Sequence, residues 1–165
     1  MIKNIFFSLI LLSLASCGIY SFTGGNTGNA KTIQVDFFPN TAPIVEPGLG
    51  QDFTLALQDL FIRQTNLDMV KTGGDLQYEG EIVEYRITPM SATADQKAAQ
   101  NRLTIGVNVR FYNNLIPEDN FEKRFSFYYD YPGTSQLIGS TQEEAYEVIF
   151  ERITQDIYNA SLAKW

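Results

Sequence analysis

The chain has 165 residues and a formal net charge of −7, because 19 Asp and Glu residues outnumber 12 Lys and Arg residues. This acidic balance argues against a general nucleic-acid binder. The sequence has no histidine and one cysteine, which excludes Ser-His-Asp triads, Cys-His pairs and zinc sites as they are usually built. The composition therefore favours a binding or scaffolding role over an enzyme, and we expect no cofactor and no metal.

A secretory signal is predicted over residues 1–16. It has a basic start at Lys3, an apolar run over residues 5–14 and a small-residue tetrapeptide, Leu-Ala-Ser-Cys, that ends at Cys17. The apolar run is far shorter than the ~20 residues of a membrane-spanning helix. The tetrapeptide resembles the bacterial lipobox, which implies cleavage before Cys17 and acylation of its thiol. The alternative is an ordinary secreted protein with an incidental cysteine, although unpaired cysteines are unusual in exported chains.

The predicted mature chain divides into a tether and one domain. Residues 17–30 are rich in Gly, Asn, Thr and Ser, a composition typical of a flexible linker. A short strand over residues 19–22 is a second interpretation of part of this segment. Residues 31–165 have the length of a single domain, and no internal repeat is visible in them.

The first elements of the domain are a strand and a helix. Alternation over residues 31–38 predicts a strand with Ile33, Val35 and Phe37 on one face. Apolar residues then recur with helical spacing, which predicts a helix of about four turns that ends near Thr65. The residues of this apolar stripe are Leu49, Phe53, Ala56, Leu57, Leu60 and Phe61.

Four further strands are considered. Residues 67–70 could form a short edge strand. Longer apolar patterns over residues 76–89, 102–112 and 121–130, joined by short connections, predict an antiparallel meander. In the first of these three, the face on which apolar residues fall changes near residues 80–83. This change indicates a β-bulge, and the alternative is a strand buried on both faces.

A long helix is predicted at the end of the chain. Thr141 and Glu144 have the spacing of a capping box. An apolar stripe follows and runs from Ala145 to Ala160. The resulting order, β-α-β-β-β-α, predicts an α+β sandwich with two helices packed on one face of a four-stranded sheet.

Two sets of charged residues are candidates for chemistry. Glu79, Glu81 and Glu84 lie close together on one predicted strand, and paired carboxylates can cleave glycosidic bonds. The other interpretation is a charged strand that discourages aggregation. A basic set could gather on the open face of the sheet together with Tyr112 and Tyr128; it consists of Arg86, Arg102, Arg110 and Arg124.

The basic set suits an anionic glycolipid. Arginine binds phosphate through two parallel hydrogen bonds, and aromatic rings stack on sugars. The alternative is solubilising charge scattered over a half-exposed sheet. Adjacent aromatic pairs, such as Phe37 with Phe38 and Tyr128 with Tyr129, cannot both face the core of an ideal strand. Some of these rings are therefore either covered by loops or exposed to a partner.

The mature chain resembles the LptE family. The resemblance rests on the order and spacing of several short motifs, each weak alone, at residues 16–24, 31–35, 38–40, 53–54, 64–67, 74–82 and 156–159 and at Trp165. It implies a fold of two helices on a four-stranded sheet, which agrees with the predicted order of elements.

The resemblance also implies a non-enzymatic lipoprotein on the periplasmic face of the outer membrane, lipid-anchored through Cys17. Such a protein plugs and helps assemble the LptD β-barrel, which moves lipopolysaccharide to the cell surface. The expected partners are thus an LptD-like barrel, lipopolysaccharide and the membrane, with no nucleic acid. The alternatives are a lipid-anchored periplasmic carbohydrate-active enzyme that uses the carboxylates, and a generic envelope adaptor.

Overall fold

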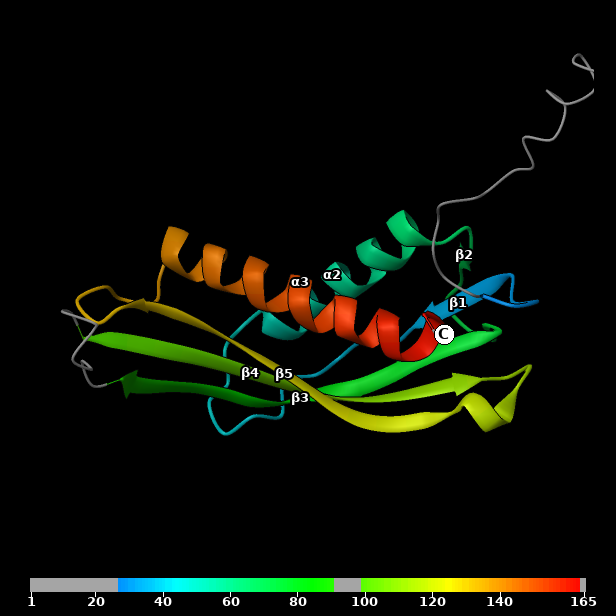
Figure 1. The fold of residues 1–165 in the computed structure, drawn as a ribbon, viewed down its shortest axis with the longest axis horizontal. Helices are drawn as coiled ribbons and strands as arrows, with labels where there is room; N and C mark the ends of the chain where they lie inside the picture. Colours follow the sequence, from blue (N-terminus) through cyan, green and yellow to red (C-terminus); the bar gives the residue numbers. More distant parts are fainter. Residues whose placement is uncertain (1–26, 91–98, 164–165) are drawn as a thin grey trace, which may run out of the picture.

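The computed structural model describes residues 27–90 and 99–163. Helices α2 and α3 lie side by side on one face of a long twisted sheet (Figure 1). The elements in chain order are β1 (Thr32–Val35), α2 (Leu49–Gln64), β2 (Asp68–Met69), β3 (Leu76–Met90), β4 (Gln100–Asn113), the short 3-10 helix η2 (Pro117–Asp119), β5 (Phe121–Pro132) and α3 (Ser140–Leu162). The predicted signal and Cys17 lie outside the described residues.

The sheet is five-stranded and mixed, with the order β2-β1-β3-β4-β5. Strands β3, β4 and β5 form the predicted antiparallel meander, which is therefore confirmed. Strand β1 runs parallel to both of its neighbours. The prediction of four strands is wrong, because the N–H groups of Asp68 and Val70 donate to the carbonyls of Lys31 and Ile33 and add β2 as a fifth strand.

Strand β1 is shorter than predicted. It ends at Val35, after which the N–H of Phe38 donates to the hydroxyl of Thr54 in α2 at 3.1 Å. The chain thus turns from the sheet toward the helix, and Phe38 becomes fully buried while Phe37 is 62% exposed. Phe37 therefore does not share the buried face of Ile33 and Val35, and that part of the strand prediction is wrong. Gln34 in the same strand is also buried, and its amide donates to Asp36 and accepts from the N–H of Gly74.

The predicted bulge in β3 is present. The pairing register of β3 with β4 shifts between Ile82 and Glu84, so that Val83 is the extra residue. Because one residue is added, Glu79 and Glu81 before the bulge share a face with Glu84 after it.

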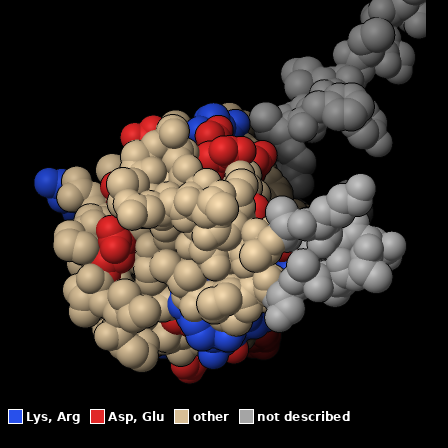
Figure 2. Space-filling model, turned by 90° about the vertical axis from the view of Figure 1, so that its left-hand side faces the viewer, with Lys and Arg blue, Asp and Glu red and all other residues tan. Residues whose placement is uncertain are grey.

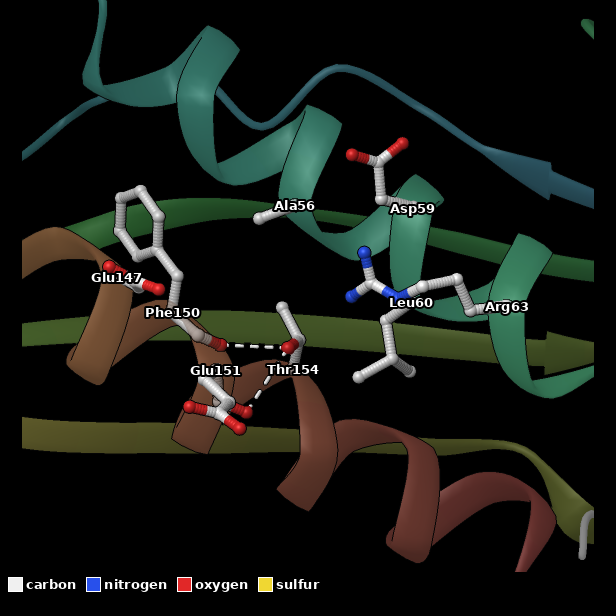
Figure 3. Close-up of a pocket in the computed structure, with 8 residues that line it drawn as sticks. All are labelled: Ala56, Asp59, Leu60, Arg63, Glu147, Phe150, Glu151 and Thr154. Atoms are coloured by element: carbon white, nitrogen blue, oxygen red, sulfur yellow. Dashed lines mark hydrogen bonds between the residues drawn. The ribbon is translucent and has the colours of Figure 1, made fainter.

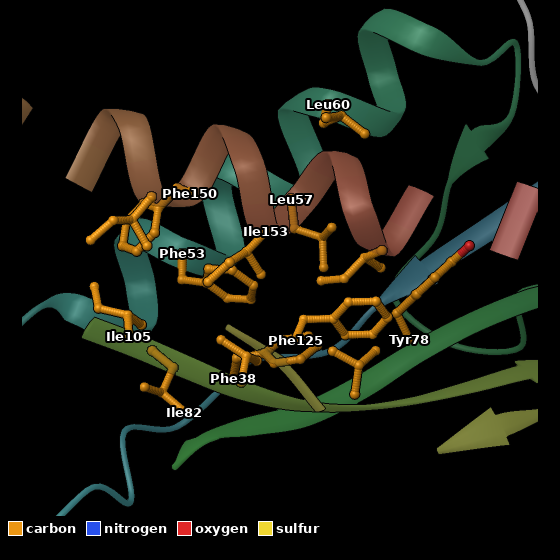
Figure 4. Packing of buried hydrophobic residues seen from close by; sticks show 14 of the residues in the cluster. Phe38, Phe53, Leu57, Leu60, Tyr78, Ile82, Ile105, Phe125, Phe150 and Ile153 are labelled. Atoms are coloured by element: carbon orange, nitrogen blue, oxygen red, sulfur yellow. The ribbon is translucent and has the colours of Figure 1, made fainter. Parts of the chain in front are cut away.

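The core lies between the sheet and the two helices (Figure 4). Its aromatic rings contact one another, with centroids of Phe38 and Phe53 5.3 Å apart and those of Phe53 and Phe150 5.5 Å apart. Tyr78 is fully buried, and its hydroxyl donates to that of Ser161 at 2.7 Å, which connects β3 to the end of α3. The alternate apolar residues of β4 are buried as predicted; they are Leu103, Ile105, Val107, Val109 and Phe111.

Helix α3 carries the predicted stripe but not the predicted cap. Ala145, Ile149, Ile153 and Ile157 are buried. The residue that precedes the helix is Gly139, and no side chain caps the free N–H groups of the first turn, so the expected capping box is wrong. No helix among the described residues is long and apolar enough to cross a membrane.

Candidate functional site

All four predicted arginines lie on the sheet face that the helices leave open. Arg102 is opposite Asp130, Arg110 is opposite Glu79 and Glu122, Arg124 is opposite Asn108 and Arg86 is opposite Thr104. Directly opposed residues share a face, and the alternate β4 residues between these positions are buried under the helices. Strand alternation therefore brings the four arginines to one surface.

Two of these arginines are fully engaged by carboxylates. Arg102 forms a bidentate pair with Asp130, with N···O distances of 2.7 and 2.8 Å, and its guanidinium lies 3.6 Å from the centre of the Tyr128 ring. This pair lowers the pKa of the Asp130 carboxyl. Arg110 donates to Glu79 at 2.8 Å and to Glu81 at 3.0 Å, which raises the pKa of its guanidinium.

The other two arginines share a single carboxylate. Glu84 accepts from Arg86 at 2.9 Å and from Arg124 at 2.5 Å. The side chains of Arg86 and Arg124 remain 61% and 53% exposed, against 28–30% for Arg110 and Arg102. Because two cations face one anion, this corner of the sheet keeps an excess positive charge and free donors.

A glycine on β4 leaves room for the contact between Arg124 and Glu84. Gly106 lies on β4 between Glu84 on β3 and Ser126 on β5. A Cβ at this position would lie 3.0 Å from a guanidinium nitrogen of Arg124 and 3.1 Å from Cβ of Glu84. The absent side chain therefore lets Arg124 extend across β4 to reach Glu84.

An apolar pocket of about 390 Å³ adjoins the two exposed arginines. Its lining residues are Pro43, Ile44, Val83, Glu84, Tyr85, Arg86 and Arg124. The segment before α2 reaches this place because it pairs with β3 near the bulge, with Ile82 donating to Pro39 and accepting from Thr41. Ile44 in this lining is 49% exposed, and Val45, which follows it in the chain, is 70% exposed. Sequence patterns did not indicate this apolar wall, because a proline-containing loop has no periodicity.

Below, the name arginine pocket denotes this pocket together with Arg86, Arg124 and Glu84. It combines half-exposed guanidinium groups with an apolar wall, an arrangement that suits a ligand with an anionic group next to a hydrocarbon. At the lower edge of Figure 2, on the sheet side of the molecule, Lys and Arg atoms lie next to Asp and Glu atoms. The open face is thus largely charge-paired.

A second hollow lies between helices α2 and α3 (Figure 3). It has a volume of about 380 Å³ and is lined by Ala56, Asp59, Leu60, Arg63, Glu147, Phe150, Glu151 and Thr154. The hydroxyl of Thr154 donates to the carbonyl of Phe150 at 2.7 Å, within its own helix. This groove has mixed charge, and its lining offers no pair of exposed arginines next to an apolar wall.

The carboxylates considered for glycoside hydrolysis have partners. Glu79 and Glu81 both accept hydrogen bonds from Arg110, and Glu84 holds the two exposed arginines. These contacts favour a role in organising the face over a role as acid and base. Over residues 27–90 and 99–163, no group of three or more residues is arranged to hold a metal ion.

Comparisons with known proteins agree with this architecture. The model of the LptE family, described as lipopolysaccharide-assembly, matches residues 30–161. None of the curated proteins compared with the chain matches it.

Among solved structures, PelC from Paraburkholderia phytofirmans is 10% identical with a TM-score of 0.50, over 84% of this chain and 94% of that one. A hypothetical protein from Chlamydia trachomatis is 12% identical with a TM-score of 0.50, over 82% and 100%. A minor lipoprotein from Acinetobacter baumannii is 10% identical with a TM-score of 0.49, over 79% and 91%. At these identities the first two likenesses concern the fold alone.

Proposed function

Because the chain belongs to the LptE lipopolysaccharide-assembly family, we propose that it is an outer-membrane lipoprotein that plugs and helps assemble an LptD-type β-barrel. Lipid on Cys17 would hold the domain at the periplasmic face of the membrane. The family match over residues 30–161 and the lipobox-like tetrapeptide that ends at Cys17 support this proposal. The role needs no catalytic group.

The arginine pocket is the observation that carries the ligand part of the proposal. Lipopolysaccharide presents phosphate groups next to acyl chains. Arg86 and Arg124 would bind a phosphate, since their side chains are half exposed and share one carboxylate. Pro43 and Ile44 would cover the first carbons of an acyl chain. Arg102 and Arg110 would instead keep the sheet face ordered, because their guanidinium groups are already bound.

The first test measures lipopolysaccharide binding to the double variant Arg86→Gln/Arg124→Gln. Loss of two charge-assisted hydrogen bonds, each worth ~1.5–3 kcal/mol, weakens binding by at least about a hundredfold. The matched control is Arg152→Gln, which removes an equally exposed arginine from α3 and leaves affinity unchanged. Wild-type affinity in the double variant, with an unchanged unfolding midpoint, would reject the arginine pocket as the binding site.

The second test asks what the protein binds in the envelope. The tagged chain is extracted from membranes in mild detergent, and the bound proteins are identified together with the mass of the Cys17 peptide. We expect an LptD-type barrel in an amount equal to that of the tagged chain, and an acylated Cys17. Recovery with an unrelated envelope protein would support the adaptor alternative, and an unmodified Cys17 would reject the lipid anchor.

A further inference from the structure

The turn after β4 exposes two neighbouring apolar side chains. Leu115 is 48% exposed and Ile116 is 47% exposed. They lie at the tip of the hairpin between β4 and β5, at the right-hand end of the sheet in Figure 1. Neither residue belongs to the core or to the arginine pocket.

The backbone of this turn is held in place by one side chain. The carboxamide oxygen of Asn113 accepts from the N–H of Leu115 at 3.0 Å and from the N–H of Ile116 at 2.9 Å. The N–H of Asn113 in turn donates to the side chain of Asn120 at 2.7 Å. Because these N–H groups already have partners, the turn can enter a less polar medium without leaving donors unsatisfied.

The start of the described chain lies at the same end of the sheet. Thr27, Gly28 and Asn29 line one pocket of about 380 Å³ together with Asn113, Leu115 and Ile116. Cys17 precedes Thr27 by ten residues, and a fully extended stretch of this length spans at most about 35 Å. A lipid on Cys17 would therefore keep the turn within that distance of the membrane.

We propose that the turn of residues 114–116 is a second membrane contact, with Leu115 and Ile116 inserted into the lipid interface of the leaflet that holds Cys17. This inference rests on the lipid anchor of the proposed function. Two half-exposed side chains would bind a bilayer weakly alone, but the tether supplies a high effective concentration. Because Glu118 and Asp119 follow after Pro117, the turn would favour zwitterionic over anionic lipid.

The test places a fluorophore on the turn of the full acylated protein. With Cys17 blocked by lipid, Ile116→Cys supplies the one reactive thiol. The labelled protein is bound to phosphatidylcholine vesicles that contain nitroxide-labelled lipid as a quencher, without any barrel present. The control is Ile138→Cys, which is 65% exposed in the segment between β5 and α3. That segment follows Pro132, which pairs with Gln100 at the opposite end of β4 from Asn113.

We expect several-fold stronger quenching at position 116 than at position 138, and weaker quenching at 116 when anionic phosphatidylglycerol replaces half of the lipid. Leu115→Cys serves as the second position if the first variant folds poorly. Equal or absent quenching in a protein whose Cys17 is acylated overturns the membrane contact and leaves the proposed function intact. An unmodified Cys17 in the mass spectrum would reject the lipid anchor, and with it both the membrane contact and the proposed function. A change in the fluorescence of position 116 that arises only after a barrel is added would overturn the inference, because a protein and not the lipid would then cover the turn.

Discussion

Gly80 occupies a point in β3 where no side chain fits. A Cβ there would lie 2.0 Å from the carbonyl oxygen of Asn108 and 2.7 Å from a ring carbon of Phe38. Both neighbours are fixed, since one is strand backbone and the other is a fully buried ring. The close approach of Phe38 to the sheet therefore depends on this glycine.

Gly80→Ala is expected to lower the free energy of unfolding by about 1–3 kcal/mol, the usual cost of overpacking. Gly106→Ala is the matched control, because the nearest atoms there belong mainly to the flexible side chain of Arg124. It is expected to cost less, since the side chain of Arg124 can shift away while the neighbours of Gly80 cannot. Urea unfolding of the three proteins checks this, and equal costs would contradict the account of Gly80.

Among single residues, the strand faces of the arginines were predictable from the sequence, but their carboxylate partners were not. Strand alternation alone placed Arg102 and Arg110 on the open face. Which carboxylate each arginine meets depends on the register of β3 against β4, and the bulge at Val83 resets that register. Glu84 consequently lies between Arg86 and Arg124, a contact that no spacing within one strand indicates.

Among the elements, long periodic segments were predicted well and short ones poorly. The stripe of α2 spans four turns, and the structure has that helix at Leu49–Gln64. Strands β1 and β2 have four and two residues, too few for alternation to be distinctive. Their bounds are set by tertiary contacts instead, such as the hydrogen bond from Phe38 to Thr54.

The cap of α3 shows the same limit. Thr141 and Glu144 have the required spacing, but the helix begins at Ser140 and so Thr141 lies inside it. A capping box requires the Ser or Thr to be the residue just before the helix. Thr141 therefore lies two residues after the N-cap position, which Gly139 occupies.

For the molecule as a whole, groups with shifted pKa values join separate parts of the fold. Asp75 accepts from the N–H groups of Lys31 and Thr32, which ties β3 to β1 and lowers the pKa of the carboxyl. Asp130 joins β5 to β4 through Arg102. Burial raises the pKa of Tyr78 under α3. Global stability should therefore fall in both acid and alkali.

The expected pH profile follows from the direction of each shift. The carboxyl pKa values are lower in the folded state, so their stabilisation is present above the ordinary value of 3.8 and is lost as the pH falls below it. The raised pKa of Tyr78 stabilises the fold below the ordinary value of 10.0, and that stabilisation is lost as the pH rises above it.

Urea midpoints measured across the pH range check the expected loss of stability at acid pH and at alkaline pH. In Tyr78→Phe the urea midpoint should fall less steeply at alkaline pH than in the wild type. It should still fall, because the pKa values of Tyr85 and Tyr146 are raised as well. A midpoint in Tyr78→Phe that falls as steeply as in the wild type would contradict the assignment to Tyr78.

The parallel pairing of β1 has a consequence for the order in which the chain can fold. Strand β1 is made before β3, but it pairs with β3 across a separation of about forty residues, from Ile33 to Leu76. The β3-β4-β5 meander closes through much shorter loops and so has the lower entropic cost. The meander can therefore form first while the edge of β3 that β1 will occupy is still open, and this interval is when a holding chaperone would matter most.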